Sequence, residues 1–190
     1  KNEIAKMSSL TDKPFGVNLP LLFLKDDSMV NFCVEHGVKF VTTSAGDPTK
    51  YVKVLKDAGI VVYHAVPSLD GALKAYNAGV DGLVVEGTEG GGFKSPVEVG
   101  LTVLIQAIKK QIDIPLIAAG GIVDGIGMAS AIAAGAEGIQ MGTRFVSSLE
   151  SPVHNNFKNS IIDSPIDGTL VLNKKSKPVR RSKRLAAKKN

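Results

Sequence analysis

Two stretches, Pro115-Leu-Ile-Ala-Ala-Gly-Gly-Ile122 and Gly138-Ile-Gln-Met-Gly-Thr-Arg-Phe145, decide the fold that we predict for this chain. Each is a short apolar run that ends in small residues, which is typical of a strand buried on both faces of a parallel sheet. Glycines after such a strand permit positive φ, so that backbone N–H groups can surround a phosphate. Two consecutive strands of this kind are typical of the phosphate site after strands 7 and 8 of a (β/α)8 barrel. The alternative is a pair of ordinary turns.

The rest of the chain repeats this alternation of strand and helix. We expect strands near residues 15, 38, 60, 82, 115 and 138, and helices over residues 1–10, 26–36, 49–58, 69–78, 100–111 and 124–135. Short connections between such units favour parallel neighbours. Six strands are two too few for closure, and 190 residues fall short of the ~250 typical of a complete barrel.

The charge of the chain is unevenly distributed. The formal net charge is +5, but residues 174–190 hold nine of the 23 Lys and Arg residues and no acid, so the body is mildly acidic. We expect a solvated connector there; the alternative is a tail that contacts nucleic acid, which the absence of interleaved aromatic residues disfavours. No apolar run approaches the ~18 residues of a membrane span. The single cysteine suits a reducing cytosol, and we expect a cytoplasmic protein.

Three side chains are candidates for function on their own chemistry. Cys33, the sole cysteine, excludes an internal disulfide, and we expect it to pack as a small apolar group. Asn18, at the carboxyl end of a strand, can offer a donor and an acceptor to a flat polar ring, or it can cap the next loop. His64 lies within a strand and points either into a site or into a packed interior. Loop residues 44–48 either leave room for a ligand or cap the next helix.

The segment Gly87-Thr-Glu-Gly-Gly-Gly-Phe93 follows the fourth strand. Three glycines in a row cost conformational entropy on folding. Such a run is explained if a ligand contacts the backbone at this position, because glycine has no side chain in the way.

Five motifs, taken in order, resemble the nitronate monooxygenase family (formerly 2-nitropropane dioxygenase), whose relative is the flavin-dependent enoyl-acyl-carrier-protein reductase II. The motifs are Pro-Phe-Gly-Val-Asn, Val-Thr-Thr-Ser-Ala-Gly-Asp-Pro, Glu-Gly-Thr-Glu-Gly-Gly-Gly, Ala-Ala-Gly-Gly-Ile-Val-Asp-Gly and Gln-Met-Gly-Thr-Arg-Phe. The likeness covers about residues 14–158. It implies an FMN-binding (β/α)8 TIM barrel of which this chain holds about the last six βα units in residues 1–160, followed by a basic segment over residues 161–190.

The resemblance also implies which residues bind the cofactor. Gly121 would lie under the FMN phosphate, and the isoalloxazine ring would meet Asn18, with Glu86 and Gly91 at its border. The rest of the phosphate site would be Gln140, Met141, Gly142 and Thr143.

Phe93 departs from the family pattern, because many members carry His directly after the glycines. A phenyl ring cannot exchange a proton, so a mechanism that needs a base at this position is not available. One explanation is that the substrate is a nitronate, which is already an anion and needs no base. The other is that the chain belongs to a subfamily that acts on a different substrate. Glu89, Lys94 and His64 are the candidate replacements, and the catalytic residue stays unassigned.

Two further points concern the edges of the resemblance. The family barrel begins with two βα units that precede Pro-Phe-Gly-Val-Asn and are absent here, so we expect either a longer polypeptide or two chains that complement each other, as in a homodimer. His154 lies in a stretch that also matches the family, and we expect it at a helix start or an interface.

By resemblance, the expected activity is oxidation of an alkyl nitronate with O2 by an FMN enzyme. The first alternative is NAD(P)H-dependent reduction of an enoyl thioester or a quinone through the same flavin. The second is a noncatalytic protein that binds flavin or nucleic acid. We expect no membrane partner and no metal.

Overall fold

The computed structural model of the protein describes residues 2–174 and 178–183. Its main sheet has six strands in the order β1-β2-β3-β4-β6-β7, and every neighbouring pair is parallel. The six predicted strands are therefore confirmed. Their bounds are β1 (Gly16–Pro20), β2 (Phe40–Ser44), β3 (Val61–Val66), β4 (Gly82–Glu86), β6 (Leu116–Ala119) and β7 (Gly138–Gln140).

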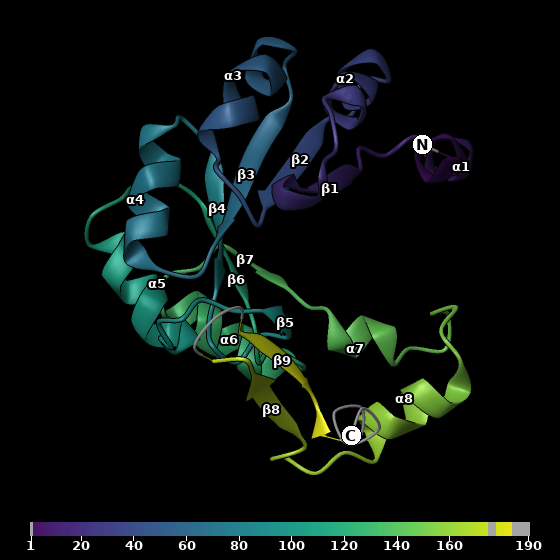
Figure 1. Ribbon diagram of the computed structural model, residues 1–190, viewed down its shortest axis with the longest axis vertical. Coiled ribbons are helices and arrows are strands. Elements are labelled where there is room, and N and C mark those ends of the chain that lie inside the picture. Colours follow the sequence, from purple (N-terminus) through teal and green to yellow (C-terminus); the bar gives the residue numbers. More distant parts are fainter. Residues whose placement is uncertain (1, 175–177, 184–190) are drawn as a thin grey trace.

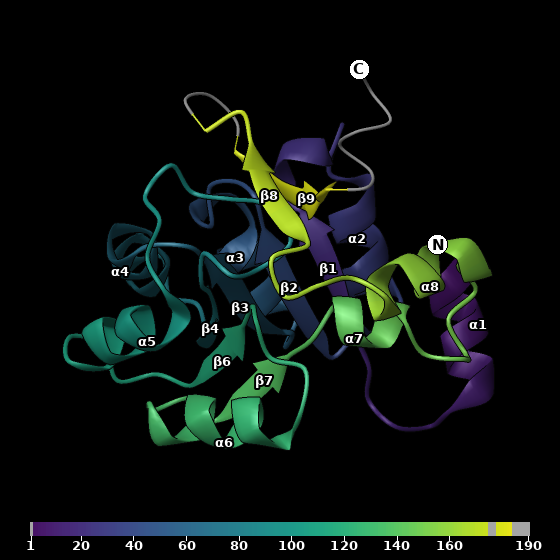
Figure 2. The same cartoon turned by 90° about the horizontal axis from the view of Figure 1, so that it is seen from below.

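The six predicted helices are also present, each within about two residues of its expected bounds. Figures 1 and 2 show the sheet as an open arc, a half-barrel, with helices α3 to α6 along its outer side. Gly37 and Gly79 follow two of the helices with positive φ, as expected of residues that end a helix. The bounds are α1 (Asn2–Leu10), α2 (Ser28–Glu35), α3 (Thr49–Asp57), α4 (Leu69–Asn77), α5 (Leu101–Lys109) and α6 (Gly125–Ala133).

The two faces of the sheet differ in burial because alternate residues of a strand point to opposite faces. The face covered by helices carries fully buried side chains, among them Val41, Val62, Leu83 and Leu116. The other face is the inside of the arc, and Asn18 is exposed there. The hydrophobic core thus lies between sheet and helices, while the inner face combines apolar residues such as Tyr63 and Val84 with polar groups.

The chain after β7 forms a second unit around a small sheet. Two helices, α7 (Thr143–Val146) and α8 (Asn155–Ile162), lead to strands β8 (Thr169–Leu172) and β9 (Val179–Ser182). The short strand β5 (Gly92–Phe93) joins them in the antiparallel order β5-β9-β8. The expectation of a solvated connector was wrong for residues 179–182, which form a strand. Residues 175–177 and 184–190 of the predicted tail lie outside the described residues.

Three smaller observations complete the fold. Cys33 is fully buried, and burial raises the pKa of its thiol, so it packs as the sequence predicts. His154 stands at the start of α8, where its ring Nδ1 accepts from the N–H of Asn156 at 3.1 Å. No helix in the described part of the chain has the length and apolar character needed to cross a bilayer.

Candidate active site

The inner face of the half-barrel gathers polar side chains at the carboxyl edge of the sheet. On one side, Ser44 of β2 donates its hydroxyl to Oδ1 of Asn18 on β1, at 3.3 Å. Farther along the sheet, Glu86 of β4 aligns with Ala119 and, through it, with Gln140 of β7. Parallel pairing thus places three of the predicted cofactor residues, Asn18, Glu86 and Gln140, on one face of one sheet.

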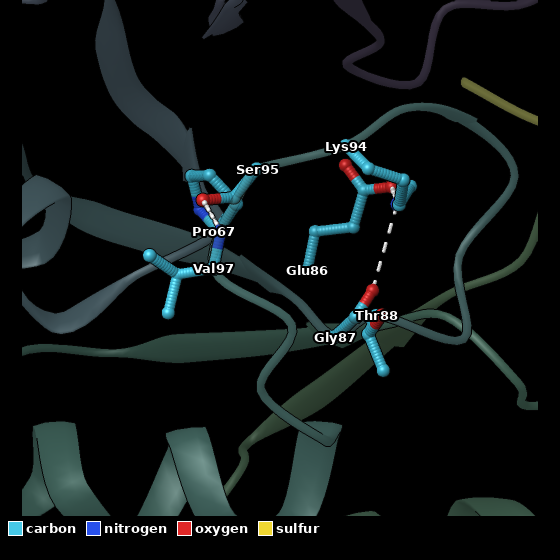
Figure 3. A pocket seen from close by; sticks show the side chains of 7 residues that line it. All are labelled: Pro67, Glu86, Gly87, Thr88, Lys94, Ser95 and Val97. Carbon is cyan, nitrogen blue, oxygen red and sulfur yellow. Dashed lines mark hydrogen bonds and ion pairs between the residues drawn. The ribbon is translucent and has the colours of Figure 1, made fainter. Parts of the chain in front are cut away.

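Glu86 is held by a cation that the sequence did not assign to it. Lys94 forms an ion pair with its carboxylate, and a longer contact of 3.5 Å joins the ammonium to the carbonyl oxygen of Gly87. Figure 3 shows the Lys94 side chain turned back over Glu86 and Gly87. The Lys94 side chain is 5% exposed and that of Glu86 30%. The charge of Glu86 is therefore compensated, and Lys94 is not a free base.

Glu89 has a structural partner as well. Its two carboxylate oxygens lie 3.2 and 3.1 Å from the backbone N–H of Leu101, the first residue of α5. An acidic side chain at a helix N-terminus satisfies an orphan donor and the positive end of the helix dipole. Glu89 therefore caps α5, and its carboxylate is engaged there.

His64 lies on the opposite face of the sheet from Asn18 and Glu86. Its Nδ1 is 2.7 Å from the hydroxyl of Thr43, and the residue is only 5% exposed. Burial is the main cause that lowers the pKa of His64 to about 4, so the imidazole is neutral at pH 7. Of the two orientations left open by the sequence, the structure has the packed one. None of the three candidate replacements for the family histidine is free on the inner face.

Phe93 itself is exposed at the mouth of the half-barrel. Its ring is 57% exposed and lies 5.8 Å, centroid to centroid, from the ring of Phe23. Phe23 ends the short 3-10 helix η1 (Leu21–Phe23) that follows β1. The segment after β4 therefore crosses the mouth and reaches the loop after β1, and two phenyl rings meet there.

The glycines of the site fall into two groups. A side chain at Gly120, where φ is +106°, would lie 2.8 Å from the N of Gly90, and one at Gly121, where φ is +71°, would lie 3.1 Å from Cβ of Glu89. These glycines allow the strand end and the loop after β4 to pack closely. Around Gly91 and Gly142, by contrast, a side chain would meet no atom within 4 Å. The three consecutive glycines are thus explained partly by packing and partly by open space.

Gln140 to Thr143 join β7 to α7. Gln140, Gly142 and Thr143 are exposed, while Met141 packs partly against the core. Gly142 caps α7, and the first N–H groups of a helix have no intrahelical acceptor. The segment from Gln140 to Thr143, called the corner after β7 below, therefore offers backbone N–H donors and the hydroxyl of Thr143 to a ligand.

The predicted cofactor residues do not all surround one cavity. Gly91 and Thr143 line a cleft of about 560 Å³ together with residues of α8, β8 and β9. Glu86 lines a separate and much smaller hollow together with Lys94. Asn18 lies on β1, the strand at one edge of the sheet.

Sequence reasoning missed Arg180 of β9. Its Nε donates to the carbonyl oxygen of Thr88 at 3.1 Å, which ties the glycine-rich loop to the C-terminal strands. No local pattern points to this contact, because the two residues are 92 positions apart. The segment from Gly87 to Phe93 is called the glycine-rich loop below.

Comparison with known proteins supports the motif resemblance. The nitronate monooxygenase family model matches residues 23–189. A Rhodococcus jostii protein described as (3aS,4S,5R,7aS)-5-hydroxy-7a-methyl-1-oxo-octahydro-1H-indene-4-carboxyl-CoA dehydrogenase is 34% identical over 92% of this chain and 49% of its own length. A probable nitronate monooxygenase of Staphylococcus saprophyticus is 31% identical over 85% and 49%.

Among solved structures, FabK from Thermotoga maritima is 44% identical and superimposes with a TM-score of 0.91, over 95% of this chain and 58% of FabK. The chain spans about half the length of the curated relatives it matches.

Proposed function

Because this chain belongs to the nitronate monooxygenase family, we propose that it carries the cofactor site of an FMN-dependent oxidoreductase that oxidises alkyl nitronates with O2. Its six strands then correspond to the last six of an eight-stranded barrel. The observation that carries the proposal is the carboxyl edge of the sheet, where the inner face presents Asn18, Glu86 and Gln140 beside glycine-bearing strand ends. Active sites of (β/α)8 barrels lie at this edge.

The corner after β7 suits the phosphate of FMN. The open space at Gly142, the exposed hydroxyl of Thr143 and the unsatisfied N–H groups of the first turn of α7 offer several donors to a dianion. Gly121, which has a positive φ, follows β6, the strand that pairs with β7. These residues, with Gln140 and Met141, would hold the phosphate.

Two side chains are placed to orient a flat polar ring on the inner face. Oδ1 of Asn18 accepts from Ser44, which leaves the amide NH2 of Asn18 as a donor. Lys94 fixes the carboxylate of Glu86, so Glu86 would act as a held acceptor near the ring. FMN, when bound, supplies the redox chemistry. The protein supplies orientation and, through Phe23 and Phe93, an apolar cover over the mouth.

The absence of a free base on the inner face, among the described residues, favours a nitronate as substrate. Glu89, Lys94 and His64 are all engaged with other groups, and Phe93 cannot exchange a proton. A nitronate has already lost the proton that a nitroalkane would have to surrender. An anionic substrate can therefore be oxidised here without proton abstraction by the protein.

An FMN titration followed by flavin fluorescence, then anaerobic reduction, tests the proposal. We expect the intact protein to bind FMN and the yellow complex to bleach on addition of propane-2-nitronate. Gly142→Asp places a negative charge in the proposed phosphate corner and should weaken FMN binding at least about tenfold. Gly125→Asp, at the first turn of α6, is the matched control and should bind FMN normally. A protein that binds no flavin would overturn the proposal.

A second candidate is NAD(P)H-dependent reduction of an enoyl thioester or a quinone. The 44% identity to FabK, an enoyl-ACP reductase, over 95% of the chain favours it, as does a relative whose described substrate is a CoA thioester. Bleaching of the anaerobic complex by NADH but not by the nitronate would select this candidate.

A further inference from the structure

The cleft that contains Gly91 and Thr143 extends beyond the proposed flavin residues. Its volume of about 560 Å³ falls within the range of small-molecule sites. The apolar part of its lining comes from α7, α8 and the turn before β8, namely Val146, Phe157, Ile161 and Pro165. The rest of the lining consists of hydroxyl-bearing residues, two arginines of β9, and Glu89, Gly91 and Gly92 of the glycine-rich loop. A cleft of this composition suits a ligand with an apolar body and an anionic group.

The arginines of the cleft have no carboxylate partner among the described residues. Arg180 donates only to neutral oxygens, the carbonyl of Thr88 at 3.1 Å and the hydroxyl of Thr169 at 3.0 Å. Arg181 is exposed and makes no ion pair within the described chain. The one acid that lines the cleft, Glu89, directs both carboxylate oxygens at Leu101. The cleft therefore carries uncompensated positive charge.

A third observation concerns Ser182, a neighbour of the two arginines on β9. The hydroxyl oxygen of Ser182, next to Arg181 on β9, is buried and has no hydrogen-bond partner. It is the one such side-chain atom in the described residues, and Ser182 also lines the cleft. Leaving a buried polar group unsatisfied destabilises a fold by about 1–3 kcal/mol. This oxygen has almost no accessible surface, so it is not a group that a ligand in the cleft contacts directly.

We propose that β9 makes this cleft a binding site for a phosphate ester, with Arg181 and the remaining donors of Arg180 on the phosphate and the apolar lining against the rest of the ligand. The planar guanidinium fork matches phosphate geometry. Gly91 and Thr143 connect the cleft to the proposed flavin corner. The phosphate belongs either to FMN, a case that rests on the proposed function, or to the nucleotide of a coenzyme that reaches the flavin from this side.

Calorimetric titrations with four ligands test the proposal and separate the two sources. FMN and riboflavin differ only in the phosphate, and adenosine 3′,5′-bisphosphate and adenosine make the same comparison for a coenzyme nucleotide. The variants are Arg181→Ala and, as a control of equal charge change, Lys110→Ala at the exposed end of α5, outside the cleft. Thermal unfolding of both variants verifies folding; Arg181→Gln provides a second, less disruptive change.

We expect Arg181→Ala to weaken one phosphorylated ligand about tenfold or more, with its unphosphorylated partner unchanged and Lys110→Ala within twofold of wild type. Loss confined to FMN identifies the flavin phosphate, and loss confined to the bisphosphate identifies a coenzyme. Equal losses for phosphorylated and unphosphorylated ligands, or no loss, overturn the inference. If the wild-type protein binds riboflavin and FMN but Arg181→Ala has no effect, this inference fails and the proposed flavin function still stands. If the wild-type protein binds neither flavin, the proposed function fails.

Discussion

At the scale of single residues, His64 links stability to pH. The unfolded chain takes up a proton near the ordinary pKa of 6.5, whereas the folded protein resists protonation of His64 until about pH 4. Its contribution is therefore fully present above pH 6.5 and is lost as the pH falls toward 4. Between pH 7 and 5 we expect the free energy of unfolding to fall by about 1–2 kcal/mol from this group, measured by urea denaturation.

The control for this prediction is the exposed His36. His64→Gln, which keeps a polar partner for Thr43 but does not titrate, should remove this part of the pH dependence. His36→Gln should leave it in place. If His64→Gln retained the full slope of the parent, the stability change would have to come from other groups.

Gly120 is the glycine for which replacement should cost most. Its φ of +106° is disfavoured for residues with a side chain, and an added Cβ would lie 2.8 Å from the N of Gly90. We expect Gly120→Ala to lower the free energy of unfolding by about 2–3 kcal/mol. Gly125→Ala, in the first turn of α6 with no atom within 4 Å, should be neutral or stabilise by up to about 1 kcal/mol. Equal midpoints for the two variants in urea would contradict this.

Phe93 offers a direct change of chemistry at the mouth of the site. Because its ring is 57% exposed, Phe93→His should leave the thermal midpoint nearly unchanged. Under the proposed function, the new imidazole should introduce a titration near pH 6–7 into kcat/KM, since an exposed histidine ionises in that range. Phe93→Leu should show no such titration, and a flat profile for both variants would mean that position 93 does not reach the reacting groups.

At the scale of elements, three contacts join β9 and the residue before it to the glycine-rich loop and the residue after it. Gly92 and Phe93 pair with β9, the N–H of Lys94 donates to Pro178 at 2.9 Å, and Arg180 reaches Thr88. We expect Arg180→Ala to accelerate hydrogen exchange of the Thr88, Gly90 and Lys94 amides about five- to tenfold, with α3 unchanged. Arg144→Ala on α7 removes an exposed arginine and should not alter these amides. Uniform acceleration throughout the protein would indicate global destabilisation instead.

The main elements were predictable because their signals are local. Apolar runs of strand length and amphipathic runs closed by glycine, such as Gly37 and Gly79, fixed six strands and six helices. The pair β8–β9 was missed although residues 169–172 read Thr-Leu-Val-Leu, because the charges of the following segment suggested a solvated connector. Its partner β5 has only two residues. Such pairing depends on tertiary contact and leaves no pattern in either segment.

The candidate site was predictable only in part, for the same reason. Its place at a strand end singled out Asn18, whereas Glu86 and Gln140 came only from the family resemblance; parallel pairing brings all three to one edge of the sheet. The partners of the acidic and imidazole side chains were not predictable, because tertiary packing sets them. Lys94 pairs with Glu86, the N–H of Leu101 donates to Glu89, and the hydroxyl of Thr43 contacts His64. Nor could the sequence separate Gly90, which packs tightly, from Gly91, which faces open space.

At the scale of the whole molecule, the half-barrel has two sheet edges without a strand partner among the described residues. β1 and β7 each pair with one neighbour only. Open edges promote association with other chains. We expect the 190-residue chain, produced alone, to self-associate at micromolar concentration in sedimentation velocity runs. A single monomer species across a hundredfold range of concentration would show that these edges are protected.

The contact between Thr88 and Arg180 also orders events during synthesis. A ribosome must deliver 92 further residues after Thr88 before its partner exists. The βα units can fold as they emerge, since each contacts its predecessor, but the wall of the cleft beside the glycine-rich loop is complete only when β9 has been synthesised. A nascent polypeptide can thus form its parallel sheet early, while the cleft beside that sheet is completed last.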